Sequence, residues 1–253
     1  YEGNQLELIN PESSKFSTIA IVNGKEVDLN QLVYSGSQTN SADTTIVTFT
    51  AQGDEGQIIE HRWSLPPTGY QIGYSLKTTG MTFSKEVDFR WINQMPLVEK
   101  DLNDSRTKTA INYHTPDGET DGTSESSLDQ ENISLPAGTD WVGMKQKFFL
   151  SAILSTKGFA GGEIETFVPA GDEKTVKTGK IQLKLSTEPI TSSGFKASFY
   201  LGPNDYKTLG DVAPGFRENV YLGWPPVSWV NEYFIVPVFL FLTKYFANYG
   251  LII

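Results

Sequence analysis

The chain of 253 residues carries 30 acidic and 20 basic residues, a formal net charge of −10, which excludes nucleic acid as an expected partner because phosphate binding depends on Lys and Arg. It has no cysteine, so a disulfide framework, a thiolate metal site and a cysteine nucleophile are excluded as well. The 23 glycines and 13 prolines predict frequent turns and favour strands over helices.

Both ends of the sequence look cut. The chain opens at Tyr1 without a start Met and closes on Gly250-Leu251-Ile252-Ile253. We therefore expect any signal peptide or first membrane anchor to lie upstream of Tyr1.

Alternating apolar and polar residues recur along most of the chain. Asn23-Gly24 separates two such runs, and this dipeptide predicts a hairpin because both residues tolerate a positive φ. Successive side chains of a strand point to opposite faces, so each run offers one apolar face to a core. The pattern predicts an all-β chain with two packed antiparallel sheets. The runs lie at 17–22, 25–29, 57–65, 70–76, 87–91, 181–185 and 195–199.

Residues 115–132 differ from the strands around them. This acidic stretch has no Lys or Arg and almost no apolar side chain, so it cannot bury enough surface to offset its ordering entropy. We expect a mobile, solvated loop. Asp117–Gly122 faintly resembles a calcium loop, but the full alternation of oxygen ligands and the distant bidentate Glu are missing. The acidic residues are Asp117, Glu119, Asp121, Glu125, Asp129 and Glu131.

The two histidines are the candidates for acid–base chemistry. His61 shares a strand face with Trp63, which indicates a hydrogen-bonded core or sheet-edge residue, and its neighbour Glu60 points to the opposite face. His114 precedes the acidic stretch and is expected to be exposed. The sequence contains no metal-ligand spacing, G-x-S-x-G elbow or phosphate loop. We therefore expect no catalytic residue, no cofactor and no metal site.

The character of the sequence changes after Pro225. Tyr233 to Leu242 is a run of ten residues without a polar side chain. On a helical wheel Glu232 and Thr243 share a face, but apolar residues lie between them, so the helix is apolar nearly all round. Ten residues span about 15 Å, half of a hydrocarbon core near 30 Å, and Pro237 interrupts the run. The segment predicts a helix that lies in the membrane interface or re-enters it rather than crossing.

Burial of these side chains in lipid would contribute roughly 1.5 to 3 kcal/mol for each fully buried one. The Trp and Tyr residues around the run are typical of a membrane interface. The alternative is a buried helix in the core of a soluble domain. The predicted membrane-interface residues are Trp224, Trp229, Phe234, Val238, Phe239, Leu240, Phe241 and Leu242.

Three stretches in the later part of the chain carry recognisable motifs. Asp140–Ala152 has the pattern W-x-x-x-K-Q-x-F-F-x-S, and Tyr200–Leu209 has Y-x-G-P-K-x-Y-x-x-L with Asn204 in place of Lys. Leu222-Gly223-Trp224 and Asn248–Ile253 are similar to a G-W and an N-W-G-x-x-I-I motif that flank an apolar helix. Together they resemble the large periplasmic domain of Gram-negative insertases of the YidC/Oxa/Alb family. Residues 1–139 match in strand character only.

The resemblance implies four parts: a periplasmic β-supersandwich related to galactose mutarotase (1–203), a helical linker (204–224), an in-plane amphipathic elbow helix (225–249) and the start of a transmembrane helix (250–253). It implies a docking or chaperone role in the insertion and folding of inner-membrane proteins, alone or with the Sec translocon and SecD/SecF. The implied location is the cell inner membrane, with this domain in the periplasm and with membrane lipid and nascent membrane proteins as partners. The family's groove and its arginine lie in membrane helices beyond Ile253.

Two other functions stay open from the residues alone. The inferred fold also suits a carbohydrate-binding or sugar-epimerase-like domain, although a fold by itself does not carry a function. A purely structural envelope protein with an ordinary buried C-terminal helix is the other alternative.

Overall fold

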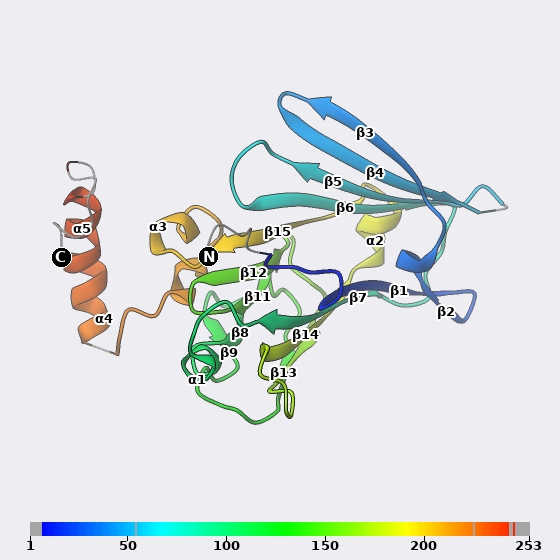
Figure 1. Ribbon diagram of the computed structural model, residues 1–253. Coiled ribbons are helices and arrows are strands. Elements are labelled where there is room, and N and C mark those ends of the chain that lie inside the picture. Colours follow the sequence, from blue (N-terminus) through cyan, green and yellow to red (C-terminus); the bar gives the residue numbers. More distant parts are fainter. Residues whose placement is uncertain (1–6, 54, 225, 243–244, 246–253) are drawn as a thin grey trace. The chain divides into compact units, whose positions relative to one another are not determined.

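The computed structural model describes residues 7–53, 55–224, 226–242 and 245. Within them the strands form two antiparallel sheets (Figure 1). The six-stranded sheet has the order β10-β13-β14-β7-β1-β2, and the nine-stranded sheet has the order β3-β4-β5-β6-β15-β12-β11-β8-β9. The expected all-β class, a β-supersandwich of two packed antiparallel sheets, is confirmed.

The described residues form fifteen strands, of which seven overlap the alternating runs of the sequence. In chain order they are β1 (Ser14–Val22), β2 (Lys25–Asp28), β3 (Ser35–Ser41), β4 (Thr44–Gln52), β5 (Ile58–Leu65), β6 (Gln71–Thr79), β7 (Val87–Pro96), β8 (Ala110–His114), β9 (Thr120–Gly122), β10 (Glu131–Leu135), β11 (Trp141–Lys145), β12 (Phe149–Leu154), β13 (Gly162–Phe167), β14 (Thr175–Leu185) and β15 (Phe195–Pro203). Short helical segments join them: η1 (Leu29–Gln31), α1 (Leu102–Arg106), α2 (Thr187–Thr191), α3 (Tyr206–Leu209) and η2 (Phe216–Asn219).

The chain divides into two compact units, 1–217 and 218–253. The first unit holds both sheets. The second begins within η2 and continues into the C-terminal helical segments. The limits of the four parts that the sequence implies stay predictions, and 250–253 lie outside the described residues.

Phe199 on β15 lies at the centre of the packing between the sheets. Its ring centroid is 5.8 Å from that of Phe16 and 6.0 Å from that of Trp91, both on the six-stranded sheet. From its own sheet, Trp63 lies 5.4 Å away. The period-2 pattern places these rings on inward faces, and each aromatic pair adds about 0.5 to 1.5 kcal/mol beyond the area that it buries.

Two tight turns of the first unit use a left-handed backbone. Asn23 and Gly24 have φ values of 51° and 75° between β1 and β2, which confirms the hairpin predicted from this dipeptide. Ala42 and Asp43 have φ values of 46° and 68° between β3 and β4. Left-handed backbone is unfavourable for Ala because its Cβ approaches the carbonyl oxygen, so the second turn carries a strain that the first avoids.

Replacing Ala42-Asp43 by Asn-Gly should therefore raise the free energy of unfolding by roughly 0.5 to 1 kcal/mol, since this pair suits a two-residue hairpin turn. Urea denaturation measures the change. The reciprocal variant, Asn23→Ala with Gly24→Asp, should lower the stability. If the urea midpoint were unchanged in both variants, the turn at Ala42-Asp43 would not be strained.

His61 is buried in the first unit and bonded through both ring nitrogens. Nδ1 lies 2.8 Å from the hydroxyl of Tyr74, and Nε2 lies 3.1 Å from that of Tyr34. The Tyr34 hydroxyl donates to Leu29 O at 2.7 Å, so it accepts from Nε2–H of His61. Burial lowers the pKa of His61 to about 4 and, together with Asp28, raises that of Tyr34 to about 12. The expectation of a hydrogen-bonded core histidine is confirmed.

This buried histidine predicts acid sensitivity. In the unfolded chain His61 becomes protonated below about pH 6.5. In the folded chain it becomes protonated only near its lowered pKa of about 4. The free energy of unfolding should therefore fall as the pH drops from 6.5 to 4, by about 2 kcal/mol at pH 5. Denaturation of wild type and His61→Gln across this range measures the effect. Equal pH slopes in the two proteins would contradict it.

Candidate functional site

The second unit contains a helix built from three consecutive segments. These are α4 (Val227–Val230), η3 (Asn231–Ile235) and α5 (Val236–Leu242), and the backbone at both junctions is right-handed helical. We refer to residues 227–242 as the C-terminal helix. Its 16 residues extend about 24 Å at 1.5 Å per residue.

η3 is a π-helical turn that ends at Ile235, two positions before Pro237. Proline has no backbone N–H, and in an α-helix its ring collides with the carbonyl four residues earlier, here that of Tyr233. A π turn shifts the hydrogen bonds to i→i+5, and the wider turn makes room for the ring. The expectation that Pro237 interrupts the helix is thus wrong, because the helix continues through the proline.

The approach to the helix depends on Gly223, which has a φ of 101°. A Cβ at this position would lie 3.1 Å from Cγ1 of Val227, so the close contact as well as the φ favours glycine. Asn231 Nδ2 then donates to Leu222 O at 2.7 Å. The Leu222-Gly223-Trp224 stretch therefore forms the turn that starts the helix.

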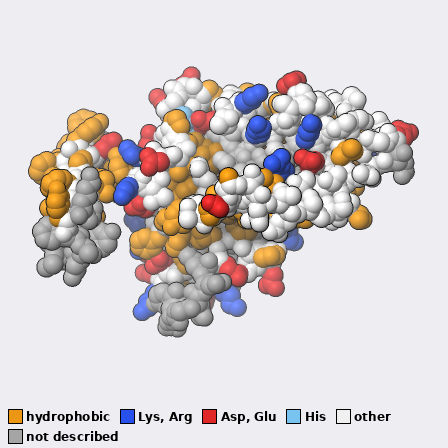
Figure 2. Space-filling view, turned by 90° about the horizontal axis from the view of Figure 1, so that it is seen from above, with side chains coloured by type: hydrophobic (Ala, Val, Ile, Leu, Met, Phe, Trp, Pro, Cys, Tyr) orange, Lys and Arg blue, Asp and Glu red, His pale blue; other side chains and the backbone are white. Residues whose placement is uncertain are grey.

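The C-terminal helix contains no buried residue, and Figure 2 shows hydrophobic side chains gathered on it. None of its residues belongs to the described hydrophobic core. The side chain of Phe234 is 63% exposed and that of Phe241 is 56% exposed. Of the other predicted membrane-interface residues, three are exposed and three are half-buried: Trp224, Trp229 and Val238, then Phe239, Leu240 and Leu242.

The helix has little charge and limited length. Glu232 is the one ionisable acid or base among its 16 residues apart from Tyr233, so attraction to acidic headgroups cannot hold it at a surface. Its exposed surface offers apolar contact instead. Among the residues that the structure describes, no helix is both long and apolar enough to cross a bilayer.

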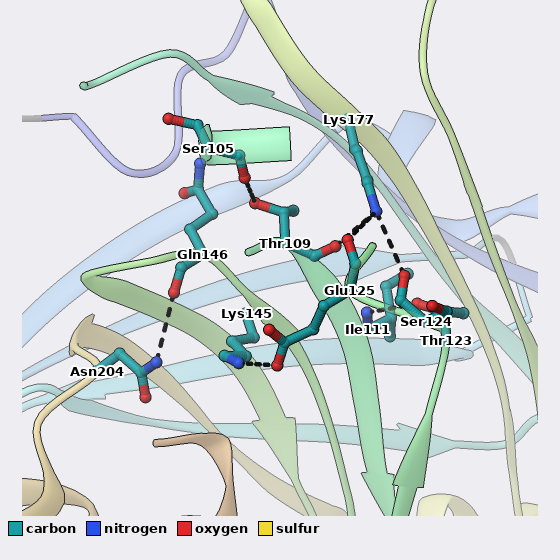
Figure 3. Close-up of polar contacts among 10 residues, drawn as sticks. All are labelled: Ser105, Thr109, Ile111, Thr123, Ser124, Glu125, Lys145, Gln146, Lys177 and Asn204. Carbon is teal, nitrogen blue, oxygen red and sulfur yellow. Dashed lines mark hydrogen bonds and ion pairs between the residues drawn. The ribbon is translucent and has the colours of Figure 1, made fainter. Parts of the chain in front are cut away.

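Two residues of the W-x-x-x-K-Q motif take part in a polar network in the first unit (Figure 3). Lys145 Nζ makes an ion pair with Glu125 of the acidic stretch. Gln146 Nε2 donates to Pro96 O at 3.2 Å, and Asn204 Nδ2 donates to Gln146 O at 3.4 Å. Asn204, which stands where the resembling family has Lys, thus ties the second motif to the first.

Lys177 is the most deeply buried cation of this network (Figure 3). Its ammonium donates to Thr109 O at 2.7 Å and to Glu125 O at 3.1 Å. Burial lowers the pKa of Lys177, while the charges of Glu131 and Glu125 act in the opposite direction. These hydrogen bonds therefore hold the backbone of the acidic stretch against β14 and the start of β8. The expected mobile loop is wrong for the parts that form β9 and β10 and for the segment held by Lys177 and Lys145.

Lys177→Met should destabilise the chain by about 3 kcal/mol, because it leaves buried carbonyls without a donor. Lys174→Met, at an exposed residue directly before β14, is the matched control and should change stability by less than about 0.5 kcal/mol. Urea denaturation compares the two. Similar losses in both variants would contradict the network's role.

The first two motifs meet again on the outer face of the nine-stranded sheet. Trp141 Nε1 donates to Pro214 O at 2.9 Å, and its ring meets that of Phe216 edge-on at 5.0 Å. Tyr200 of the second motif contacts the same Phe216 ring at 5.4 Å. All three rings are buried. These motif residues therefore hold the segment after β15 against the sheet, which is a structural role.

His114 lies beside this packing, and the expectation that it is exposed is wrong. Its side chain is 9% exposed, and Nδ1 lies 2.8 Å from Oδ1 of Asp140. The imidazole stacks on Trp141 at 6.0 Å with an interplanar angle of 9°. Gly215 packs so closely that a Cβ there would lie 2.7 Å from His114 Cδ2. Sequence reasoning missed this pair because 26 positions separate its members along the chain.

A surface hollow of about 580 Å³ adjoins Asp140 and Trp141, with Gln71, Lys196 and Ser198 among its lining residues. His114 does not line it. In the described part of the chain, no three His, Asp or Glu side chains are grouped to hold a metal ion.

The packed sheets and the exposed apolar helix define a β-sandwich domain followed by a C-terminal helix with exposed apolar side chains. The chain belongs to the YidC periplasmic domain family, whose model matches residues 2–236. The resemblance seen in the sequence motifs is thereby confirmed. The third motif's last stretch, 248–253, lies outside the described residues.

Relatives named membrane protein insertase YidC align with the whole chain. The one from Cytophaga hutchinsonii is 34% identical over 100% of this chain and 43% of its own length. The one from Amoebophilus asiaticus is 31% identical over 100% of this chain and 44% of its own length. The chain thus spans less than half of these relatives. Among solved structures, the α-galactosidase from Lactobacillus brevis aligns with a TM-score of 0.42 and 12% identity, over 81% of this chain and 31% of that one.

Proposed function

We propose that the chain is the periplasmic part of a membrane protein insertase and acts without catalysis, as a docking and holding surface for membrane proteins during insertion. The C-terminal helix lies at the surface of the inner membrane in this proposal. Its partners are membrane lipid, nascent membrane proteins, the Sec translocon and SecD/SecF. Membership of the YidC periplasmic domain family supports the insertase role, and the relatives from Cytophaga hutchinsonii and Amoebophilus asiaticus are named membrane protein insertases.

The observation that carries the membrane part of the proposal is the exposed apolar surface of the C-terminal helix. A soluble monomer rarely leaves a contiguous apolar patch of this kind uncovered, and such patches mark interaction sites. The helix is shorter than a bilayer core near 30 Å and has one acidic residue, Glu232, and no basic one. A helix that lies in the plane of the membrane interface fits both its length and its charge.

Vesicle binding by the intact chain tests this position directly. Phe234→Asp with Phe241→Asp should weaken binding to neutral phosphatidylcholine vesicles at least about a hundredfold, since each lost side chain contributes about 1.5 kcal/mol or more. The measurement is co-flotation with the vesicles. Val33→Asp, at an apolar side chain of the first unit that is 93% exposed, is the matched control. Equal co-flotation of the wild type, the double variant and the Val33→Asp control would contradict binding of the helix at the membrane interface.

Function in cells provides a second test, in the full-length parent protein. Phe239→Asp with Leu242→Asp should slow growth of a strain that depends on this copy and reduce insertion of membrane proteins several-fold, because the helix would lose its hold on lipid. Pulse labelling of clients measures insertion, and Val33→Asp serves as the control. Growth and insertion at the wild-type level would contradict the anchoring role.

The sugar-binding alternative has its own test. Calorimetry of the intact chain against a panel of monosaccharides and disaccharides should give no saturable heat if the docking role is right. Saturable binding of one sugar would favour the carbohydrate function instead.

A further inference from the structure

The two sheets end in four edge strands, and three of them are protected against pairing. β9 has three residues, β2 has four with Lys25, Glu26 and Asp28 among them, and β10 has five with Glu131 at its start. Short length and charge are the usual means by which an edge avoids pairing with another chain. β3 lacks both protections.

β3 spans seven residues, Ser-Gly-Ser-Gln-Thr-Asn-Ser, without a charge or a proline, and every one is exposed. Within the described residues β3 pairs with β4 alone, over its whole length. Alternate residues of such an edge point their N–H and C=O groups away from the partner strand. β3 therefore presents an open row of main-chain donors and acceptors.

The inward side of this edge adjoins apolar surface. Gly36 pairs with Phe49, and a Cβ on Gly36 would lie 3.6 Å from the Phe49 ring. Gly36 has no side chain to cover this ring, and Phe49 is 40% exposed. Phe49 lines a hollow of about 210 Å³ between the diverging sheets, with Phe16, Tyr34, Trp63 and Phe89 also in its lining. Figure 1 shows β3 and β4 rising away from β1 and β2 at this end.

We infer that β3 is a strand-addition site for an extended polypeptide segment with apolar side chains at alternate positions. The segment continues the nine-stranded sheet through main-chain hydrogen bonds, as in other cases of β-augmentation. Its inward side chains pack over Gly36 against Phe49. Pairing through the main chain tolerates varied sequences. The choice of occupant rests on the proposed docking role.

A second copy of this chain is a poorer occupant of the same edge. β3 has no apolar side chain on either face, so pairing of two β3 strands would supply main-chain bonds and leave Phe49 uncovered. A foreign strand with Val or Ile on its inward face supplies both the bonds and the apolar contact.

The test measures binding of a fluorescein-labelled peptide of the length of β3 to the intact chain by fluorescence anisotropy. The probe alternates Val with Thr and has Lys at both ends. One control peptide has the same composition with its Val residues in a single block, and another has N-methyl groups throughout the alternating part. The alternating peptide should bind at least about tenfold more tightly than either control, because only it offers both the apolar face and the N–H donors.

Two variants of β3 locate the site. Gln38→Lys places a charge on the inward face, since Gln38 pairs with Val47 and Val47 pairs with Trp63 of the hollow. This change should weaken peptide binding at least about tenfold, as inward charges do at protected edges. Ser37→Lys adds the same charge on the opposite face and should change binding by less than about threefold.

Three results would overturn the inference. The first is that the N-methylated peptide binds as tightly as the alternating peptide. The second is that Gln38→Lys binds the alternating peptide as tightly as the wild type does. The third is that the wild-type chain without peptide is a dimer and that Gln38→Lys makes it a monomer. None of them concerns the C-terminal helix, so the strand-addition site can fail while vesicle binding succeeds, and the reverse also holds.

Discussion

The packing of Phe199 against both sheets is the contact on which the rest of the first unit depends. It brings the inward faces of β15, β1 and β7 together, and the six-stranded sheet then closes over the middle of the nine-stranded one. The nine-stranded sheet extends beyond this contact. At β3 and β4 it diverges from β1 and β2 (Figure 1), and Phe49, beside the bare backbone of Gly36, is partly exposed. The open edge and the aromatic hollow are thus consequences of unequal sheet widths around one central ring.

Buried cations and aromatic rings organise the opposite end. Lys177 and Lys145 bind the acidic stretch, while Trp141 and Tyr200 hold the segment around Phe216. Each cation satisfies groups that burial would otherwise leave without a partner. The motifs that reveal the family therefore act in folding. The exposed helix and the sheet edge, where a partner can be reached, lie outside those motifs for the most part.

The fold class could be predicted from the sequence because period-2 alternation is a local property. The runs ending at Val22, Leu65 and Phe199 all became strands, and Asn23-Gly24 became a tight turn. Long-range pairs could not be predicted. Two examples are the contact between His114 and Asp140 and the hydrogen bonds that Lys177 donates to the acidic stretch. Both depend on which strands become neighbours in the sheets. The acidic composition suggested a solvated loop because no local signal reveals a buried ammonium elsewhere in the chain.

The candidate membrane-interface residues were predicted from the apolar run and a helical wheel, and the structure adds their exposure and the path of the backbone. Helical-wheel reasoning assumed a uniform 100° step. The π turn at Asn231–Ile235 breaks that assumption, so the angular relation of Glu232 to the apolar residues after Pro237 differs from the ideal wheel. The scarcity of polar residues in the helix does not depend on the angle per residue.

The same π turn has a consequence for how this helix can change over evolutionary time. It accommodates one more residue than an α-helical turn does, so it is equivalent to a single-residue insertion absorbed in place. Deleting one residue from Asn231–Ile235 would return the turn to α-helical geometry and keep the flanking segments in phase. A gap of one position at this point in an alignment of homologues would therefore preserve the directions in which Trp229 and Phe241 point, whereas the same gap within α5 would rotate everything after it.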